Sequence, residues 1–160
     1  MGKESGPYLR KLVKLSEVVL DTSVIIAYKP LEFGKWVSAV VLQELVAGAK
    51  DKGEIQTFRA IMTEVFKSGH LLIPDHEDWF QAGRILNTIL RNEKRLDFQK
   101  LTPHFSEGYK QSLVRDVLIA RTAKRQKLTV VSDNKDFPLI QRYYDFDWIG
   151  GKEYFTGEDK

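Results

Sequence analysis

Short apolar runs that do not alternate with polar residues are the feature that most constrains the fold of this chain. Residues 18–20, 71–73 and 128–131 are apolar or nearly so, and residues 35–37 and 146–149 are weaker strand candidates. Half-exposed strands alternate apolar with polar residues, whereas parallel strands covered by helices on both faces do not. The runs therefore predict a buried parallel sheet.

The segments between these runs carry apolar residues at helical spacing. Three- and four-residue steps recur in residues 55–66, 79–90 and 113–123, and Ser38 is a candidate N-cap for a helix over residues 38–49. Strands that alternate with helices in this way are typical of an α/β sandwich. We therefore expect an α/β fold with a central parallel sheet of four to five strands.

One domain accounts for most of the 160 residues. We expect this domain at residues 17–150, a flexible or weakly helical N-terminal extension at 1–16 and a C-terminal tail at 151–160. Residues 91–111 are polar and aperiodic, so a long excursion or a loosely packed helical arm is expected there. The chain has no cysteine, which excludes disulfides, thiolate metal sites and cysteine nucleophiles.

Composition also restricts location and partners. No apolar run approaches the roughly 18–20 residues of a membrane span, and residues 1–16 lack the apolar core of a signal peptide, so we expect a soluble, cytoplasmic protein without a membrane partner. The net charge of +3 permits an anionic partner but does not establish one. Basic residues are concentrated in the middle of the chain: Arg84, Arg91, Lys94, Arg95, Lys100, Lys110, Arg115, Arg121, Lys124 and Arg125.

Acidic residues follow two of the predicted strands. Asp21 comes directly after the first run, and Asp133 comes just after residues 128–131, with Asn134 and Asp136 beside it. In a parallel α/β sheet, ligands bind at the carboxyl ends of the strands. These side chains are therefore expected at one edge of the sheet.

Two further carboxylates lie on helices with largely apolar neighbours. Valines and leucines surround Glu44 in the sequence, and Asp116 shares a helical face with apolar residues. A carboxylate beside a core-facing stripe loses hydration, so it needs a cation, a hydrogen-bond donor or a proton. Both residues are therefore candidates for the same site as Asp21.

Each acidic residue also has an ordinary structural role open to it. Asp21 could cap a helix, and Glu44 could reach water at the edge of its helix. Asp133 and Asp136 suit turns and caps. Asp116 could pair with a basic neighbour on its own helix: Arg115, Arg121 or Lys124. Only the joint placement of the acids, at strand ends and on apolar helix faces, favours a shared site.

A cluster of carboxylates without histidine or cysteine ligands suits a hard cation such as Mg²⁺ or Mn²⁺. The three histidines of the chain have no metal-ligand spacing. A cation of this kind bridges a phosphodiester, activates a water and neutralises the leaving oxygen. The acids therefore indicate a nuclease-like site.

The ordered motifs resemble those of the PIN-domain ribonucleases, specifically the VapC-type toxins of toxin–antitoxin pairs. VVLDTSVIIA at 18–27, VSAVVLQELVAGA at 37–49 and RDVLIARTA at 115–123 resemble their three acid-bearing motifs. VVSDNKDFPLI at 130–140 is similar to their closing segment, and IPDHEDWFQAGRIL at 73–86 resembles the region between the second and third acids. The resemblance covers about residues 18–149 and implies a PIN-like α/β/α sandwich.

The resemblance also implies an activity. It implies Mg²⁺- or Mn²⁺-dependent hydrolysis of RNA by a metal-activated water, with Asp21, Glu44 and Asp116 as the catalytic acids and metal ligands. The fourth acidic position of the family falls on Asn134, so Asp133, Asn134 or Asp136 is expected to complete the metal site. The hydroxyls after the first acid, Thr22 and Ser23, are auxiliary candidates. A homodimer and a cognate antitoxin are the protein partners implied.

Other classes of protein stay open as alternatives. A non-catalytic PIN-like module that binds RNA or protein is favoured by the missing acid at Asn134. A phosphatase of the haloacid dehalogenase type needs a second aspartate two positions after Asp21, where Ser23 stands. A response-regulator receiver has paired acids at the strand end, where Leu20 precedes a single aspartate.

Overall fold

The computed structural model of the chain describes residues 17–30, 33, 35–97 and 107–157. The expected N-terminal extension at 1–16 lies outside the described residues. The strands are β1 (Val18–Leu20), β2 (Val37–Ser38), β3 (Leu71–Leu72), β4 (Thr129–Val131) and β5 (Trp148–Ile149). The helices are α2 (Thr22–Tyr28), α3 (Ala39–Ala47), α4 (Lys52–Lys67), α5 (His76–Asp97), α6 (Glu107–Arg125), α7 (Asp136–Gln141) and α8 (Gly151–Thr156).

All strand pairings are parallel, as the unalternating apolar runs predicted. β4 lies between β1 and β5 in a three-stranded sheet, and β2 pairs with β3 in a second sheet. One isolated bridge between Val19 and Trp36 joins the two sheets. The α/β class is therefore confirmed, but the expected single sheet of four to five strands is divided. β2 and β3 are only two residues long, and β2 begins just after Trp36. The pairing between β1 and this part of the chain is therefore limited to the single bridge.

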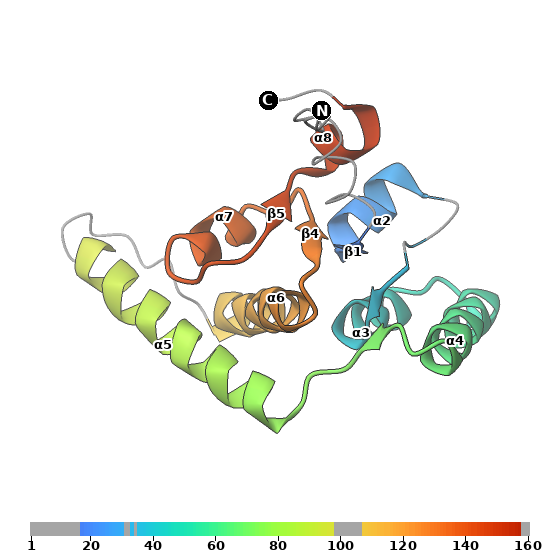
Figure 1. Ribbon diagram of the computed structural model, residues 1–160, viewed down its shortest axis with the longest axis horizontal. Coiled ribbons are helices and arrows are strands. Elements are labelled where there is room, and N and C mark those ends of the chain that lie inside the picture. The colour runs from blue at the N-terminus through green and yellow to red at the C-terminus, as the bar shows by residue number, and fades with distance from the viewer. Residues whose placement is uncertain (1–16, 31–32, 34, 98–106, 158–160) are drawn as a thin grey trace, which may run out of the picture.

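The core lies between the sheet and the helices that cover it. In Figure 1, α3 and α6 lie on one side of the three-stranded sheet, and α2 and α8 lie on the other. Every residue of β1 is buried, and α6 contributes a run of buried residues from Val117 to Ala120. Burial on both faces explains why the strands carry no polar alternation. The first turn of α3 is capped as expected, because the Ser38 hydroxyl accepts a hydrogen bond from the Val40 amide.

Two segments are more regular than the sequence predicted, although a helical arm was one of the two forms expected for the first. Helix α5 continues to Asp97 and α6 begins at Glu107, so much of the polar stretch at 91–111 is regular helix, and residues 98–106 lie outside the described part. Residues 91–97 are mostly Arg, Glu, Lys and Leu, and strong helix formers of this kind continue a helix without an apolar face. Residues 151–156, placed in a C-terminal tail, form α8, whose first residue is buried.

A buried ion pair ties the start of α5 to the end of α6. Asp78 is fully buried and accepts hydrogen bonds from Arg125 Nε and Nη2 at 3.0 and 2.8 Å. Arg121 Nε lies 3.2 Å from the other carboxylate oxygen. Buried charges persist only when they are paired in this way. Arg121 and Arg125 therefore hold the two longest helices together.

Replacing Gly151 by alanine should destabilise the domain. A Cβ at this position would lie 2.6 Å from Val24 Cγ1 and 2.7 Å from Asp133 Oδ2. We expect a loss of about 1–3 kcal/mol in the free energy of unfolding, measured by chemical denaturation. Gly83→Ala is the matched control: it meets nothing within 4 Å inside α5, so helix propensity should stabilise it by about 0.5–1 kcal/mol. Equal stability of the two variants would contradict this packing.

Candidate active site

Four carboxylates come together where β1 and β4 end. They belong to Asp21 after β1, Glu44 on α3, Asp116 on α6 and Asp136 at the start of α7, and we call them the acidic cluster. The charges of the other three members all act on the Asp116 carboxyl and raise its pKa. The structure thus brings together the three acids singled out in the sequence, and it adds Asp136 to them.

Asp21 is held by hydroxyl groups from two elements. The residue is only 3% exposed, and Oδ2 accepts hydrogen bonds from Ser23 Oγ at 2.9 Å and Ser132 Oγ at 2.7 Å. Asp21 occupies the N-cap position of α2, but its side chain makes no capping hydrogen bond. The carboxylate is therefore directed at the two serines rather than used to begin the helix.

Glu44 is held from two sides. Oε2 accepts a hydrogen bond of 2.7 Å from the Thr22 hydroxyl, and Oε1 lies 3.0 Å from Arg115 Nε. Thr22 begins α2, so this bond fixes α2 against α3. The side chain of Glu44 is 21% exposed, which leaves it at the edge of the acidic cluster rather than fully in solvent.

Asp116 lies in the environment least favourable to its charge. Burial, followed by the charges of Asp21 and Asp136, a hydrogen bond with Asp136 and the charge of Glu44, raises its pKa to about 9. Asn134 Nδ2 donates a 3.0 Å hydrogen bond to Asp116 Oδ2. Without a nearby cation, the Asp116 carboxyl therefore holds a proton at neutral pH.

The basic neighbours of Asp116 on α6 pair with other acids. Arg115 lies beside Glu44, Arg121 binds the buried Asp78, and Lys124 Nζ lies 3.6 Å from Asp145. The simple ion pair that the sequence left open for Asp116 is therefore absent among the described residues.

The polar side chains of the turn after β4 point in two directions. Asp133 points to α8, where Oδ1 accepts a 2.8 Å hydrogen bond from the Gly151 amide. Asn134 Oδ1 accepts from the Asp136 amide at 3.0 Å while the other end of the amide holds Asp116. The Asp136 carboxylate accepts a 2.9 Å hydrogen bond from the Tyr109 hydroxyl. Asn134 thus connects Asp116 and Asp136, two members of the acidic cluster, whereas Asp133 anchors α8.

Three residues of this site were not among the candidates from the sequence. Ser132 supplies the second hydroxyl on Asp21, and its position at the end of a strand beside Asp133 was the available signal. Arg115 faces Glu44, whereas the sequence suggested it as a partner of Asp116 and as one of the basic residues in the middle of the chain. Tyr109 lies in the aperiodic stretch, where no sequence pattern indicated that its hydroxyl reaches Asp136.

The donor set of the acidic cluster fits a hard divalent cation. All its potential ligands are carboxylate oxygens, with the amide oxygen of Asn134 beside them, and oxygen is the ligand type that Mg²⁺ and Mn²⁺ prefer. Four carboxyl groups share the site, and a cation would relieve the repulsion that raises the pKa of Asp116. Within the described part of the chain, no set of three His, Cys, Asp or Glu side chains is already arranged to hold a metal ion.

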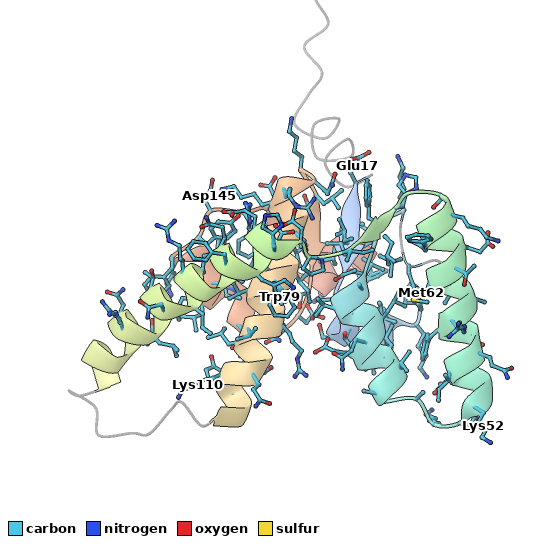
Figure 2. All side chains as sticks on the ribbon, turned by 90° about the horizontal axis from the view of Figure 1, so that it is seen from below. Glu17, Lys52, Met62, Trp79, Lys110 and Asp145 are labelled. Carbon is cyan, nitrogen blue, oxygen red and sulfur yellow. The ribbon has the colours of Figure 1, made fainter. Side chains whose placement is uncertain are left out.

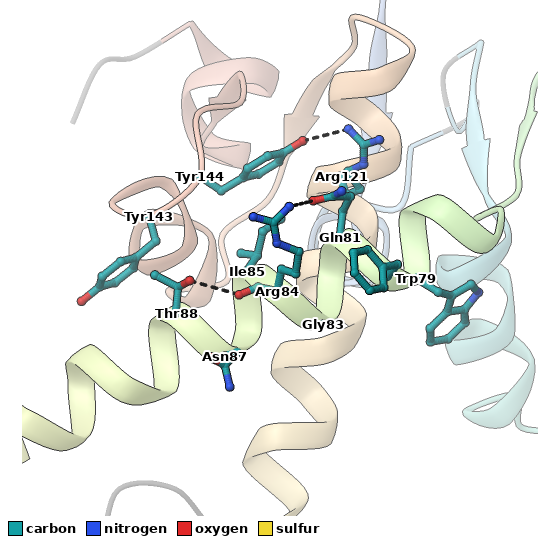
Figure 3. Close-up of a pocket in the computed structure, with 11 residues that line it drawn as sticks. Trp79, Gln81, Gly83, Arg84, Ile85, Asn87, Thr88, Arg121, Tyr143 and Tyr144 are labelled. Atoms are coloured by element: carbon teal, nitrogen blue, oxygen red, sulfur yellow. Dashed lines mark hydrogen bonds between the residues drawn. The ribbon is translucent and has the colours of Figure 1, made fainter.

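A concave surface lies apart from the acidic cluster. An open pocket of about 620 Å³ lies over α5, α6 and the turn after α7 (Figure 3). Arg84, Trp79 and Tyr144 line it, together with Arg121, which donates to the Tyr144 hydroxyl at 3.5 Å. No member of the acidic cluster lines this pocket. We therefore assign the candidate active site to the acidic cluster and not to this pocket.

Comparison with known proteins identifies the fold. The PIN domain family model matches residues 18–143, which confirms the resemblance seen in the sequence. The structure of VapBC-1 from nontypeable Haemophilus influenzae is 18% identical, with a TM-score of 0.51 over 84% of this chain and 98% of the other. The structure of FitAB bound to an IR36 DNA fragment is 18% identical, with a TM-score of 0.47 over 84% and 94%. No curated protein sequence matches the chain.

Asp116→Asn should stabilise the metal-free protein, and the gain should grow with pH. The folded state holds a proton on Asp116 up to a pKa of about 9, while an aspartate ordinarily loses it near 3.8, so the stability of the wild type falls between these values as pH rises. Thermal melts in chelator at about pH 5 and about pH 8 test this. The fully exposed Asp145 gives the control Asp145→Asn, which should show no such trend. The same effect of Asp116→Asn at both pH values would contradict the raised pKa.

Proposed function

The chain belongs to the PIN domain family, and we propose that it is a metal-dependent endoribonuclease that hydrolyses RNA phosphodiesters. The observation that carries the proposal is the convergence of Asp21, Glu44, Asp116 and Asp136 at the ends of β1 and β4. Four acidic side chains that share one site with a single paired arginine among the described ion pairs are costly to a fold, so they indicate a site that functions with a bound cation. Nuclease activity is also typical of the family.

The side chains of the site divide into ligands and residues that orient them. Asp21 and Asp116 would hold the cation, and Glu44 and Asp136 would complete the shell or position the attacking water. A bound Mg²⁺ or Mn²⁺ would lower the pKa of a coordinated water and neutralise charge on the phosphodiester. Serine hydroxyls on Asp21, and the Asn134 amide on Asp116, fix which carboxylate oxygens face the site.

Asn134 contributes without a charge. Its amide donates to Asp116, whereas an aspartate at that position would add a further negative charge beside a carboxyl whose pKa is already about 9. The same feature favours a second candidate function, a non-catalytic module that binds RNA or protein through this site. Binding of RNA without cleavage in the presence of Mg²⁺ and Mn²⁺ would favour the second candidate.

RNA is the proposed substrate because of the family and the basic middle of the chain. Several of those basic residues have acidic partners: Arg115 with Glu44, and both Arg121 and Arg125 with Asp78. Arg84 and Arg91 are exposed on α5 and are better placed to contact phosphates.

No helix in the described residues is long and apolar enough to cross a membrane. We place the activity in the cytoplasm, where its RNA would be found.

Two protein partners belong to the proposal. A cognate antitoxin is supported by the likeness of four motifs to VapC-type toxins and by the fold shared with VapBC-1.

A second copy of the chain is supported by apolar side chains on α4 and α5 that lie open to solvent, with Phe66 64%, Trp79 56% and Phe80 63% exposed. Figure 2 shows Trp79 and Met62 on either side of α3 in that view. Large exposed apolar side chains of this kind are candidates for a contact with a second copy.

Removing the charge of Asp21 or Asp116 should abolish cleavage of single-stranded RNA in Mg²⁺ or Mn²⁺. Asp21→Asn and Asp116→Asn lose a ligand, whereas Ser132→Ala loses only an orienting hydroxyl and should cost about 10–100-fold. Asn134→Ala should weaken cleavage without abolishing it, and the exposed Asp145→Asn should leave it unchanged. Gel analysis of the products tests the chemistry, since 2′,3′-cyclic phosphate ends require attack by the RNA itself instead of water. Equal activity of the wild type, Asp21→Asn and Asp116→Asn would contradict the assignment.

A charge on the exposed apolar surface should weaken self-association. Phe66→Lys is expected to raise the dimer dissociation constant about tenfold or more in sedimentation equilibrium. Ile26→Lys on α2 is the control, because Ile26 is equally exposed but lies on another helix. A monomeric wild type, or a dimer that Phe66→Lys leaves unchanged, would rule out this surface.

A further inference from the structure

Arg115 is a cation that faces the acidic cluster. It precedes Asp116 on α6, and its Nε lies 3.0 Å from Glu44 Oε1. Among the described ion pairs, no other basic residue is paired with a member of the acidic cluster. The position of Arg115 therefore determines how much of the charge of Glu44 is available to a divalent cation.

The ion pair between Arg115 and Glu44 is suited to being broken. Arg115 Nε is shielded from solvent and has no aligned acceptor for its N–H, so the pair lacks a well-directed hydrogen bond. The Arg115 side chain as a whole is 42% exposed, and its outer guanidinium nitrogens are not among the buried atoms that lack a partner. Half-exposed ion pairs contribute little to stability. The outer edge of the guanidinium therefore faces solvent at the margin of the acidic cluster.

The other arginines near the end of α6 are not free to move in this way. Arg121 and Arg125 share the fully buried carboxylate of Asp78, and withdrawing them would leave that charge uncompensated. Glu44, in contrast, keeps the Thr22 hydroxyl on Oε2 when Arg115 leaves Oε1. Arg115 can thus be released without leaving a fully buried charge unpaired.

We propose, on the basis of the nuclease function proposed above, that Arg115 is a movable countercharge that exchanges Glu44 for an RNA phosphate beside the cleaved bond. Without RNA, Arg115 competes with the divalent cation for Glu44, because two cations on one carboxylate oxygen repel each other. An RNA phosphate gives the guanidinium a planar, doubly hydrogen-bonding partner. RNA binding thereby frees Glu44, so RNA and the divalent cation each strengthen the binding of the other.

This role predicts opposite effects of one substitution on the two ligands. In Arg115→Gln, Glu44 has no competing cation, so Mn²⁺ in the absence of RNA should bind up to about fivefold more tightly. The same variant loses a phosphate contact, so single-stranded RNA in chelator should bind about tenfold more weakly. The slope of log affinity for RNA against log salt concentration should fall in magnitude by about 0.7. A merely structural ion pair predicts none of these opposed shifts.

The experiment uses the full chain and measures Mn²⁺ binding by electron paramagnetic resonance and RNA binding by fluorescence anisotropy. Arg115→Lys keeps the charge without the planar fork, so its RNA affinity should lie between those of the wild type and Arg115→Gln. Arg142→Gln is the matched control, because Arg142 pairs with Glu93 and not with a member of the acidic cluster, and it should change neither affinity. Matching circular dichroism spectra and melting temperatures confirm that the variants are folded.

The outcomes separate this proposal from the one on which it rests. A wild type that cleaves RNA, together with an Arg115→Gln variant that binds Mn²⁺ equally or more weakly and RNA unchanged, overturns the countercharge role alone. A wild type that neither binds Mn²⁺ nor cleaves RNA overturns the nuclease function and the countercharge role together. Opposite shifts in the two affinities, with the smaller salt slope, support the countercharge role.

Discussion

Repulsion among carboxylates at the ends of β1 and β4 is the interaction on which the rest of this structure depends. Burial and three neighbouring acids raise the pKa of Asp116 to about 9, so the fold tolerates the acidic cluster by keeping a proton on it. The hydroxyls of Ser23 and Ser132 on Asp21, and of Thr22 on Glu44, partly compensate the other carboxylates. A divalent cation would displace the proton and compensate the negative charge of the carboxylates more completely than the hydroxyl groups do. The site therefore indicates metal-dependent chemistry.

The parallel fold creates this arrangement from distant segments. β1 and β4 lie side by side in register, so the residues that follow them, Asp21 and Ser132, meet at one edge of the sheet. Helix α6 packs on β4 through its buried face and brings Asp116 to the same edge, where Asn134 holds it. The ion pair of Asp78 with the end of α6 fixes that helix from its other end. Stability and site geometry thus depend on the same helix.

Much of the fold followed from the sequence, and the site followed in part. Unalternating strands and acids on apolar helix faces are local patterns, and they indicated the parallel sheet and the residues Asp21, Glu44 and Asp116. The different orientations of Asp133 and Asp136 were not predictable, because the partner that turns Asp133 away is the amide of Gly151, 18 positions along the chain. Arg115 faces Glu44 from another helix, and such a contact leaves no periodic signal in the sequence.

The number of protons released when Mn²⁺ binds tests this account most directly. Calorimetric titrations of the wild type, in buffers of different ionisation enthalpy at about pH 7, give that number from the difference in measured heats. A cation that replaces the proton on Asp116 should release about one proton per Mn²⁺ bound. Binding of Mn²⁺ without proton release, or no binding, would show that the repulsion among these carboxylates is not what the cation relieves.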